Sequence, residues 1–337
     1  MKKLRIGVLG GGAIARASHI PGYAANENCE LTAIADILPS SLAGVREKWH
    51  FEHEYSDCSE LLQKERPDLV SICLPNKYHA RYAIEAMECG CDVILEKPVA
   101  ISMEEAESIK AAQQRTGRRL AVCFSHRFNP LAIAARDAVL AGKIGEPYMI
   151  HVRFAHTGPY PGWAKTDWFY NPEMAGGGAV LDMGIHAIDL AHWFIGDIKA
   201  VTGFSETLRK KIEVEDNTVA AFKFDRPAMG YIECGWTSVA GFYGLEIMGD
   251  KGAVLANYAE EKTILTQGGF TPDGKFETKS EVIGTLTVDA WENQMAKLIE
   301  AELKEEPFPT SIDDGIKALK VALAIYDSAR TGRTIEL

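Results

Sequence analysis

Short, continuously apolar runs alternate with longer amphipathic stretches over the first third of the chain. Apolar runs without polar alternation are typical of strands buried on both faces of a parallel sheet. They lie at residues 4–9, 30–35, 69–74, 92–95 and 120–124, and helix-like stretches lie at 13–25, 40–49, 78–89 and 104–116. The alternation predicts a doubly wound α/β domain of about 120 residues.

The pattern changes after residue 124. Most of the later strand-like segments alternate apolar and polar residues, which is typical of strands with one face in a core. They lie at 148–154, 201–206, 218–224, 230–236, 244–248 and 253–256, with helical patterns at 131–141, 186–194 and 288–304. We therefore expect a second, α+β domain with a large, mostly antiparallel open sheet and helices on one face. Its other face would be free to pack against another subunit.

These patterns give three expected segments. Residues 1–123 form a Rossmann domain, and residues 124–312 form a domain for substrate and oligomerisation. The segment 313–337 contains a last helix, over 313–330, and is expected to pack back on the first domain. A length of 337 residues agrees with two domains at roughly 150 residues each.

Composition and charge narrow the class of protein. Hydrophobic residues make up 47% of the chain and charged residues 25%, as in ordinary folded proteins. A net charge of −11 argues against nucleic acid or an anionic membrane as the main partner. The seven cysteines are scattered without the spacing of a zinc site, which favours free thiols in a reducing compartment.

The first residues superficially resemble a signal peptide, with two lysines followed by an apolar run and a small-residue site. Arg5 interrupts that run and glycines dilute it, and no later run reaches the ~20 apolar residues of a membrane span. We therefore expect a cytoplasmic protein.

A glycine motif follows the first predicted strand directly. Gly10, Gly12 and Ala15 match the dinucleotide-binding pattern, in which the first position makes a tight turn and the second admits the pyrophosphate. The third position keeps the helix close to the strand, and the helix N-terminus offers unpaired N–H groups to the phosphates. The preceding strand and following helix provide the context that this pattern requires.

Asp36 ends the second predicted strand, about 20 residues after the motif, where a ribose-binding carboxylate belongs. A carboxylate accepts hydrogen bonds from the adenosine ribose and repels a 2′-phosphate. Ile37 and Leu38 follow it and offer no arginine for such a phosphate. NAD is therefore favoured over NADP, although a turn-capping role for Asp36 remains an alternative.

Several further motifs, taken in order, resemble those of the glucose–fructose oxidoreductase / inositol dehydrogenase (Gfo/Idh/MocA) family over nearly the whole chain. The resemblance implies a Rossmann domain followed by an α/β domain with a large open sheet, and assembly into dimers or tetramers through that sheet. The matching segments are Pro75-Asn76 with His79, Glu96-Lys97-Pro98, Arg127-Phe128-Asn129-Pro130, Asp167-Trp168, and the run from Gly176 through Asp182 and His186 to Asp189.

The resemblance also implies roles for individual residues. Gly12, Ala13 and Ile14 would contact the pyrophosphate, next to the turn at Gly10, and Asp36 would contact the ribose. Residues after the third and fourth strands would line the rest of the cofactor: Leu74, Pro75, Asn76, His79, Glu96 and Lys97. Lys97 would join Asp182 and His186 around the substrate carbon.

The chemistry of these three residue types suits hydride transfer from an alcohol. The reaction needs a base for the hydroxyl proton and a positive charge beside the developing alkoxide. His186 has a suitable pKa for the first role, and Lys97, at the carboxyl end of a strand, suits the second. Asp182 lies one helical turn before His186, so both side chains can face one cleft. Without the resemblance, a structural, hydrogen-bonded histidine is the favoured interpretation of His186, and a surface lysine is the alternative for Lys97.

Four further residues are candidates for the substrate pocket, because aromatic faces pack on sugar C–H groups and charged groups bind hydroxyls. They are Arg127, Tyr160, Trp163 and Trp168, with core packing as the alternative for the tryptophans. A metal cluster of Asp182, His186, Asp189 and His192 is the competing interpretation of the helix. We expect no metal, since the last two would turn to other faces.

The sequence therefore predicts an NAD-dependent oxidoreductase acting on the CH–OH group of a cyclic polyol, sugar or sugar derivative. Two alternatives stay open. One is an NAD-using glycosidase that oxidises its substrate only transiently, and the other is a non-catalytic NAD(H)-responsive regulator.

Overall fold

The computed structural model describes residues 3–337, and these residues form two compact units, each built from three segments of the chain. The first unit comprises residues up to 124 together with 163–176 and 291–319. The second comprises 125–162, 177–290 and 320–337. The domain limits expected from the sequence stay a prediction.

The first unit contains a parallel sheet of six strands in the order β3-β2-β1-β4-β5-β6. This is the strand order of a dinucleotide-binding Rossmann fold, which confirms the predicted α/β class. The edge strand β3 was not expected from the sequence. The strands are β1 (Leu4–Leu9), β2 (Cys29–Ala35), β3 (His53–Tyr55), β4 (Leu69–Ile72), β5 (Asp92–Leu95) and β6 (Leu120–Val122).

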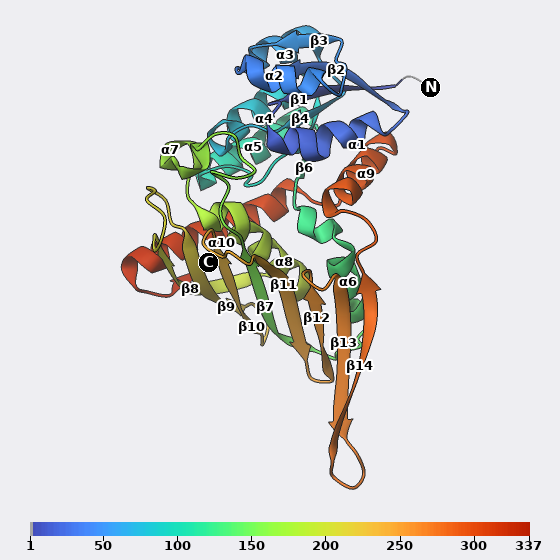
Figure 1. Ribbon diagram of the computed structural model, residues 1–337, viewed down its shortest axis with the longest axis vertical. Coiled ribbons are helices and arrows are strands. Elements are labelled where there is room, and N and C mark those ends of the chain that lie inside the picture. Colours follow the sequence, from blue (N-terminus) through green and yellow to red (C-terminus); the bar gives the residue numbers. More distant parts are fainter. Residues whose placement is uncertain (1–2) are drawn as a thin grey trace. The chain divides into compact units, whose positions relative to one another are not determined.

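Several helices of the first unit pack on this sheet (Figure 1). Two of these helices begin at a capping residue. The side chain of Asp57 accepts a hydrogen bond from the third amide of α3, and the side chain of Ser102 accepts one from the third amide of α5. The helices are α1 (Ile20–Ala24), α2 (Pro39–Arg46), α3 (Cys58–Glu65), α4 (His79–Glu88), α5 (Met103–Thr116), α7 (Pro172–Ala175) and α9 (Ala290–Leu303).

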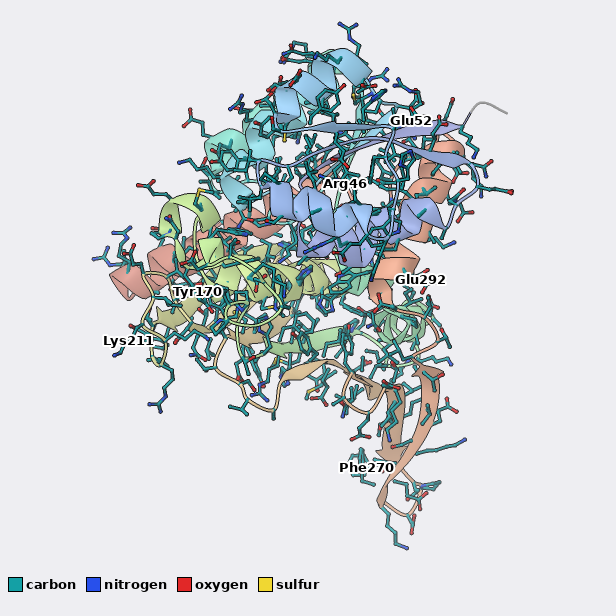
Figure 2. The ribbon with its side chains drawn as sticks, turned by 45° about the horizontal axis from the view of Figure 1, so that its top comes forward. Arg46, Glu52, Tyr170, Lys211, Phe270 and Glu292 are labelled. Atoms are coloured by element: carbon teal, nitrogen blue, oxygen red, sulfur yellow. The ribbon has the colours of Figure 1, made fainter. Side chains whose placement is uncertain are left out.

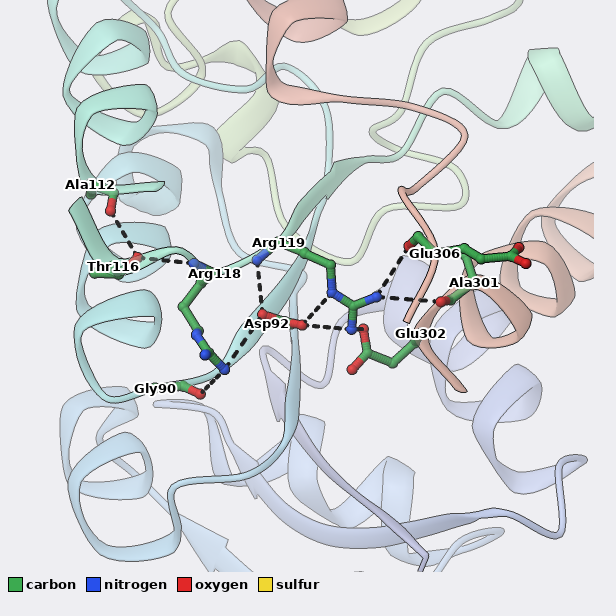
Figure 3. A network of polar contacts seen from close by, with 9 residues as sticks. All are labelled: Gly90, Asp92, Ala112, Thr116, Arg118, Arg119, Ala301, Glu302 and Glu306. Carbon is green, nitrogen blue, oxygen red and sulfur yellow. Dashed lines mark hydrogen bonds and ion pairs between the residues drawn. The ribbon is translucent and has the colours of Figure 1, made fainter. Parts of the chain in front are cut away.

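The guanidinium group of Arg119 joins the sheet of the first unit to α9 (Figure 3). Its Nε donates to Asp92 at 2.7 Å, and a terminal nitrogen donates to Glu302 at 2.5 Å. The other terminal nitrogen donates to the backbone carbonyls of Ala301 and Glu306. One side chain thereby fixes the end of α9 against β5.

The second unit contains a nine-stranded sheet in the order β14-β13-β12-β11-β7-β10-β9-β8-β15. Only β7 and β10 pair in parallel, so the prediction of a large, mostly antiparallel sheet is confirmed. The strands are β7 (Pro147–Ala155), β8 (Ile198–Glu206), β9 (Asn217–Phe224), β10 (Met229–Gly235), β11 (Phe242–Gly249), β12 (Gly252–Asn257), β13 (Lys262–Phe270), β14 (Phe276–Thr285) and β15 (Ile335–Glu336).

The central strands of this sheet bury one face. In β9, Thr218, Ala220 and Phe222 are buried, whereas Val219, which lies between Thr218 and Ala220, is 52% exposed. Helix α6 (Pro130–Leu140) packs on β12, β13 and β14, and α8 (Ile185–Ile195) packs on β7 and β10. The last helix, α10 (Ile312–Thr331), gives its first residues to the first unit and the rest to the second.

Strands β13 and β14 form a long ribbon that the sequence did not lead us to expect (Figure 1). Phe270 lies near its far end (Figure 2), where it packs against Phe276 with ring centroids 5.2 Å apart. Both rings remain mostly exposed. Among the described residues, none of the helices is long and apolar enough to cross a membrane.

Candidate active site

The glycine turn after β1 closes tightly onto the end of β4. Gly10 has a φ of +94°, and a Cβ atom on it would lie 2.4 Å from the carbonyl oxygen of Cys73. The amide of Gly10 donates to the carbonyl of Ala35 at 2.8 Å. Only glycine fits this position, both in backbone conformation and in space.

Gly12 differs from Gly10 in that a Cβ atom on it would have no neighbour within 4 Å. Ala13 and Ile14 beside it are half-buried, and a π-helical turn (Ala15–His19) continues into α1. The open space therefore lies at the start of a helix, where amide N–H groups attract phosphate. This local geometry fits a dinucleotide pyrophosphate.

Asp36 directly follows β2 and lies against the glycine turn. Its two carboxylate oxygens accept hydrogen bonds from the amides of Gly11 and Leu38, each at 2.8 Å. The turn-capping role is thus observed, and it leaves the carboxylate half-buried. Because each carboxylate oxygen has a second lone pair, Asp36 keeps acceptor capacity for ribose hydroxyls.

His79 joins the loops that follow β4 and β5. Its ring nitrogens lie 2.7 Å from the carbonyl oxygen of Pro98 and 2.9 Å from that of Leu74. The side chain is fully buried, and burial lowers the pKa of its imidazole despite these hydrogen bonds. Nearby, the amide of Asn76 donates to the carbonyl of Ala175 at 2.8 Å, and Pro75 is half-buried.

Glu96, at the end of β5, belongs to a buried polar chain that the sequence analysis missed. Its carboxylate lies 2.9 Å from Nε2 of His19, whose Nδ1 lies 2.8 Å from the hydroxyl of Ser71. That hydroxyl also contacts Tyr23 at 2.6 Å. Burial alone would raise the pKa of Glu96, but the hydrogen bond and charge of His19, followed by Lys97, lower it. Sequence spacing does not predict these contacts, because they join segments up to 77 residues apart.

Lys97 follows directly, and its half-buried position is bordered by buried residues on both sides. Its amide donates to Glu96 at 3.3 Å. Among the described residues, His19, Glu96 and Cys123 place one potential metal-ligand atom each within 4.8 Å of one another. Since His19 and Glu96 already satisfy each other by hydrogen bonding, we assign no metal to them.

In the second unit, Asp182 and His186 lie on one continuous helix. Asp182 belongs to a π-helical turn (Val180–Gly184), which continues into α8 at Ile185, just before His186. Both side chains are buried. Oδ2 of Asp182 accepts a hydrogen bond from the indole nitrogen of Trp236 at 2.9 Å, and Nε2 of His156 lies 3.7 Å away.

The partner residues Trp236 and His156 were not expected from the sequence. The amide of Gly158 donates to Nδ1 of His156 at 2.7 Å, so a neutral ring carries its proton on Nε2, toward Asp182. The ring of His186 meets the ring of His126 edge-on at 4.8 Å. His126 in turn stacks on Phe154 at 4.3 Å.

The other pocket candidates lie in different surroundings. Arg127 makes a two-pronged ion pair with Asp189 at 2.8 and 2.5 Å, which gives Asp189 a role other than metal binding. Tyr160 and Trp163 are 39% and 49% exposed, and Trp168 stacks on Phe169 at 3.8 Å. Tyr160 belongs to the second unit, whereas Trp163 and Trp168 belong to the first.

Comparison with known families covers both units. The family described as "Oxidoreductase family, NAD-binding Rossmann fold" matches residues 4–124. The "GFO/IDH/MocA C-terminal domain" matches residues 132–255. The chain belongs to the Gfo/Idh/MocA oxidoreductase family. The predicted family and the NAD-binding Rossmann fold are thereby confirmed.

Curated relatives of this Gfo/Idh/MocA chain include proteins named as dehydrogenases. The D-glucoside 3-dehydrogenase of Escherichia coli is 33% identical over 60% of this chain and 57% of its own length. The myo-inositol 2-dehydrogenase of Thermotoga maritima is 25% identical over 99% and 98%. The D-xylose 1-dehydrogenase (NADP(+)) 2 of Haloferax volcanii is 24% identical over 99% and 100%.

A solved structure shares the fold along the whole chain. It is a levoglucosan dehydrogenase in complex with NADH and levoglucosan, with a TM-score of 0.88, 22% identity and 99% coverage of both chains. At this identity the likeness establishes the arrangement of elements.

Proposed function

We propose that this protein is an NAD(H)-dependent oxidoreductase that transfers hydride between the nicotinamide and a secondary alcohol carbon of a cyclic polyol, sugar or sugar derivative. The observation that carries the proposal is the buried pair on one helix, Asp182 and His186, with Trp236 and His156 directed at the carboxylate. The names of the curated relatives support this substrate class.

The first unit holds the nucleotide in this proposal. The open space at Gly12, with Ala13 and Ile14, receives the pyrophosphate, and Asp36 accepts from the adenosine ribose. We propose NAD rather than NADP, because a 2′-phosphate would meet the carboxylate of Asp36 and find no arginine at the next two positions. Leu74, Pro75, Asn76 and His79 line the cofactor, and Glu96 and Lys97 reach the nicotinamide end.

Side chains of the protein transfer the proton and stabilise the charge that develops on the substrate oxygen. When bound, NAD supplies a hydride acceptor. His186 takes the hydroxyl proton as the C–H bond breaks and the C=O bond forms. The ammonium group of Lys97 stabilises the developing alkoxide, and Asp182 orients His186 or holds a neighbouring hydroxyl. In the reverse direction His186 returns the proton.

Arg127, Tyr160, Trp163 and Trp168 are the proposed contacts for the rest of the substrate. The exposed rings of Tyr160 and Trp163 suit packing on sugar C–H groups. The ion pair with Asp189 holds the guanidinium of Arg127 in one orientation.

We also propose a homodimer or homotetramer formed through the outer face of the nine-stranded sheet. Val219, Met229 and Tyr231 are each at least 42% exposed on neighbouring strands β9 and β10. A replacement of Met229 by Glu should lower the mass measured by light scattering. A mass that stays at the wild-type oligomer would contradict this interface.

The activity is tested by following NADH absorbance with a panel of inositols, aldoses and glycosides. We expect saturable turnover with at least one member, its near-complete loss in His186→Ala, and unchanged NAD binding in that variant. His192→Ala, on the same helix, is the matched control and should retain turnover.

The alternatives give other results in the same assay. Sugar release from a nitrophenyl glycoside without net NADH change would indicate transient oxidation instead. NAD binding without turnover on any substrate would indicate a regulator. Either outcome would overturn the proposed net redox reaction.

A further inference from the structure

The carboxylate of Glu215 caps the helix that carries Asp182 and His186. Its Oε2 accepts from the amide of Gly178 at 2.8 Å, and its Oε1 accepts from the amide of Val180 at 2.9 Å. The backbone carbonyl of Glu215 also accepts from the amide of Ala179 at 3.1 Å. Three successive amides at the start of the helix therefore donate to one residue, which precedes β9.

A second contact fixes the capping side chain itself. The hydroxyl of Tyr326, on α10, donates to Oε1 of Glu215 at 2.9 Å. The carboxylate thus faces three donors, and only an acceptor on both oxygens satisfies them all. The first amides of a helix lack partners within the helix, and a negative group near them is favourable.

We call the contacts of Glu215 and Tyr326 at the start of this helix the clamp. The glycines that precede the helix leave room for it. A Cβ atom on Gly177 would lie 2.1 Å from the hydroxyl oxygen of Tyr326. A Cβ atom on Gly178 would lie 2.0 Å from the backbone oxygen of Glu215. Glycine is required at both positions for the capping groups to approach the helix.

One helical turn connects the clamp to Asp182. The amide of Asp182 donates to the carbonyl of Gly178 at 3.1 Å, so the π-helical turn starts from the clamped residue. Asp182 then meets Trp236 at 2.9 Å on the other side. A displacement of the helix start would move both Asp182 and His186.

We propose that Glu215 is a positioning residue for Asp182 and His186, acting with Tyr326 through the first amides of their helix. This inference rests on the proposed function. A misplacement of about 1 Å in a reacting group costs on the order of 100-fold in rate, so a modest loss of register has a measurable effect.

The test compares Glu215→Gln with Asp216→Asn. A glutamine in either orientation turns its NH2 group toward the amide of Gly178 or of Val180, which sets a donor against a donor. Asp216 is the matched control, because this buried neighbour caps a different segment, the amides of Leu208, Arg209 and Lys210. Both variants lose a capping carboxylate from the same loop.

We expect Glu215→Gln to lower kcat by at least about tenfold while the KM for NAD changes by less than about twofold. Asp216→Asn should keep kcat within about twofold of the wild type, even if its Tm falls. The proposal is overturned if Glu215→Gln keeps the wild-type kcat, or if Asp216→Asn loses as much.

A second variant serves if Glu215→Gln is unstable. If Glu215→Gln does not fold, Tyr326→Phe replaces it, with an expected threefold or greater loss of kcat and an unchanged KM for NAD. An unchanged kcat in that variant refutes the inference.

Hydrogen exchange separates this proposal from the proposed function, because it needs no activity. The amides of 178–186 should exchange faster in Glu215→Gln than in Asp216→Asn, and equal rates would refute the clamp. If the wild type itself turned over no substrate, the proposed function would fail while this comparison still tested the clamp.

Discussion

The indole N–H of Trp236 donates a hydrogen bond to Oδ2 of Asp182, with 2.9 Å between the two atoms. Trp236 is 1% exposed and follows β10 directly, whereas Asp182 lies on the π-helical turn before α8. The orientation of the carboxylate is therefore set by the sheet as well as by its own helix.

Replacing Trp236 by Phe should lower kcat by about tenfold or more, because a hydrogen bond to a charged group contributes about 1.5–3 kcal/mol. The KM for NAD should not change, since the nucleotide motif lies in the other unit. Steady-state kinetics measure both constants. Trp49→Phe, at a half-buried position of the first unit, is the control, and equal kcat values for the two variants would contradict a role for this bond.

Gly10 and Gly12 should respond differently to alanine. Gly10→Ala places a methyl group against the carbonyl of Cys73 at a positive φ, so the Tm of the nucleotide-free protein should fall by several degrees. Gly12→Ala meets open space, so its Tm should stay near the wild-type value while the Kd for NAD rises by at least about tenfold. Differential scanning calorimetry and titration calorimetry provide the two readings. Unweakened NAD binding by Gly12→Ala would argue against a pyrophosphate at that place.

Replacing Asp36 by Ala should weaken NAD binding by about tenfold and narrow the gap between the Kd values for NAD and NADP. The variant loses the ribose acceptor and the charge that repels a 2′-phosphate. It also loses the hydrogen bonds to the amides of Gly11 and Leu38, so its Tm should fall. A ratio of the two Kd values equal to that of the wild type would show that Asp36 serves the turn alone.

Glu302 should make the stability of the protein depend on pH. Burial raises the pKa of Glu302 to about 7, with Asp92 adding to the rise and Arg119 opposing it. Between about pH 4.5 and 7 the folded chain holds a proton that the unfolded chain has released, so the free energy of unfolding falls as pH rises through this window. Glu302→Gln should reduce the Tm difference between pH 5 and pH 8 by about 2–4 °C.

Glu300, on the same helix, is the control for that experiment. Hydrogen bonds from Lys304 and Lys297 lower the pKa of Glu300 to about 2, so the group stays ionised from pH 5 to pH 8. Glu300→Gln should leave the pH dependence of Tm as it is. A wild-type slope in Glu302→Gln would show that Glu302 is not the titrating group.

The sequence predicted the parts of the fold whose hydrophobic pattern is strong. The five apolar runs are strands of the parallel sheet, and the helix expected at 313–330 is observed as α10. Strands β13 and β14 escaped prediction because much of the ribbon is exposed on both faces and therefore shows no apolar face. Two adjacent glycines, Gly268 and Gly269, weaken the strand signal further.

The candidate site was predictable where a motif is local. The space beside Gly12 and the position of Asp36 follow from spacing within one βαβ unit. The contacts of Asp182 with Trp236 and of Glu215 with Gly178 join segments 54 and 37 residues apart. Such contacts depend on tertiary packing, so neither periodicity nor spacing reveals them.

The second unit is built from three stretches of chain, and the third, residues 320–337, contains Tyr326. Tyr326 lies 111 residues after Glu215 in the chain. The carboxylate of Glu215 therefore lacks this hydrogen-bond donor until the later segment has been synthesised. A nascent chain released before about residue 320 would carry every residue of the proposed catalytic set but lack part of the scaffold that orders it. Chaperones and proteases of the cell would act on such a chain as on a partly folded protein.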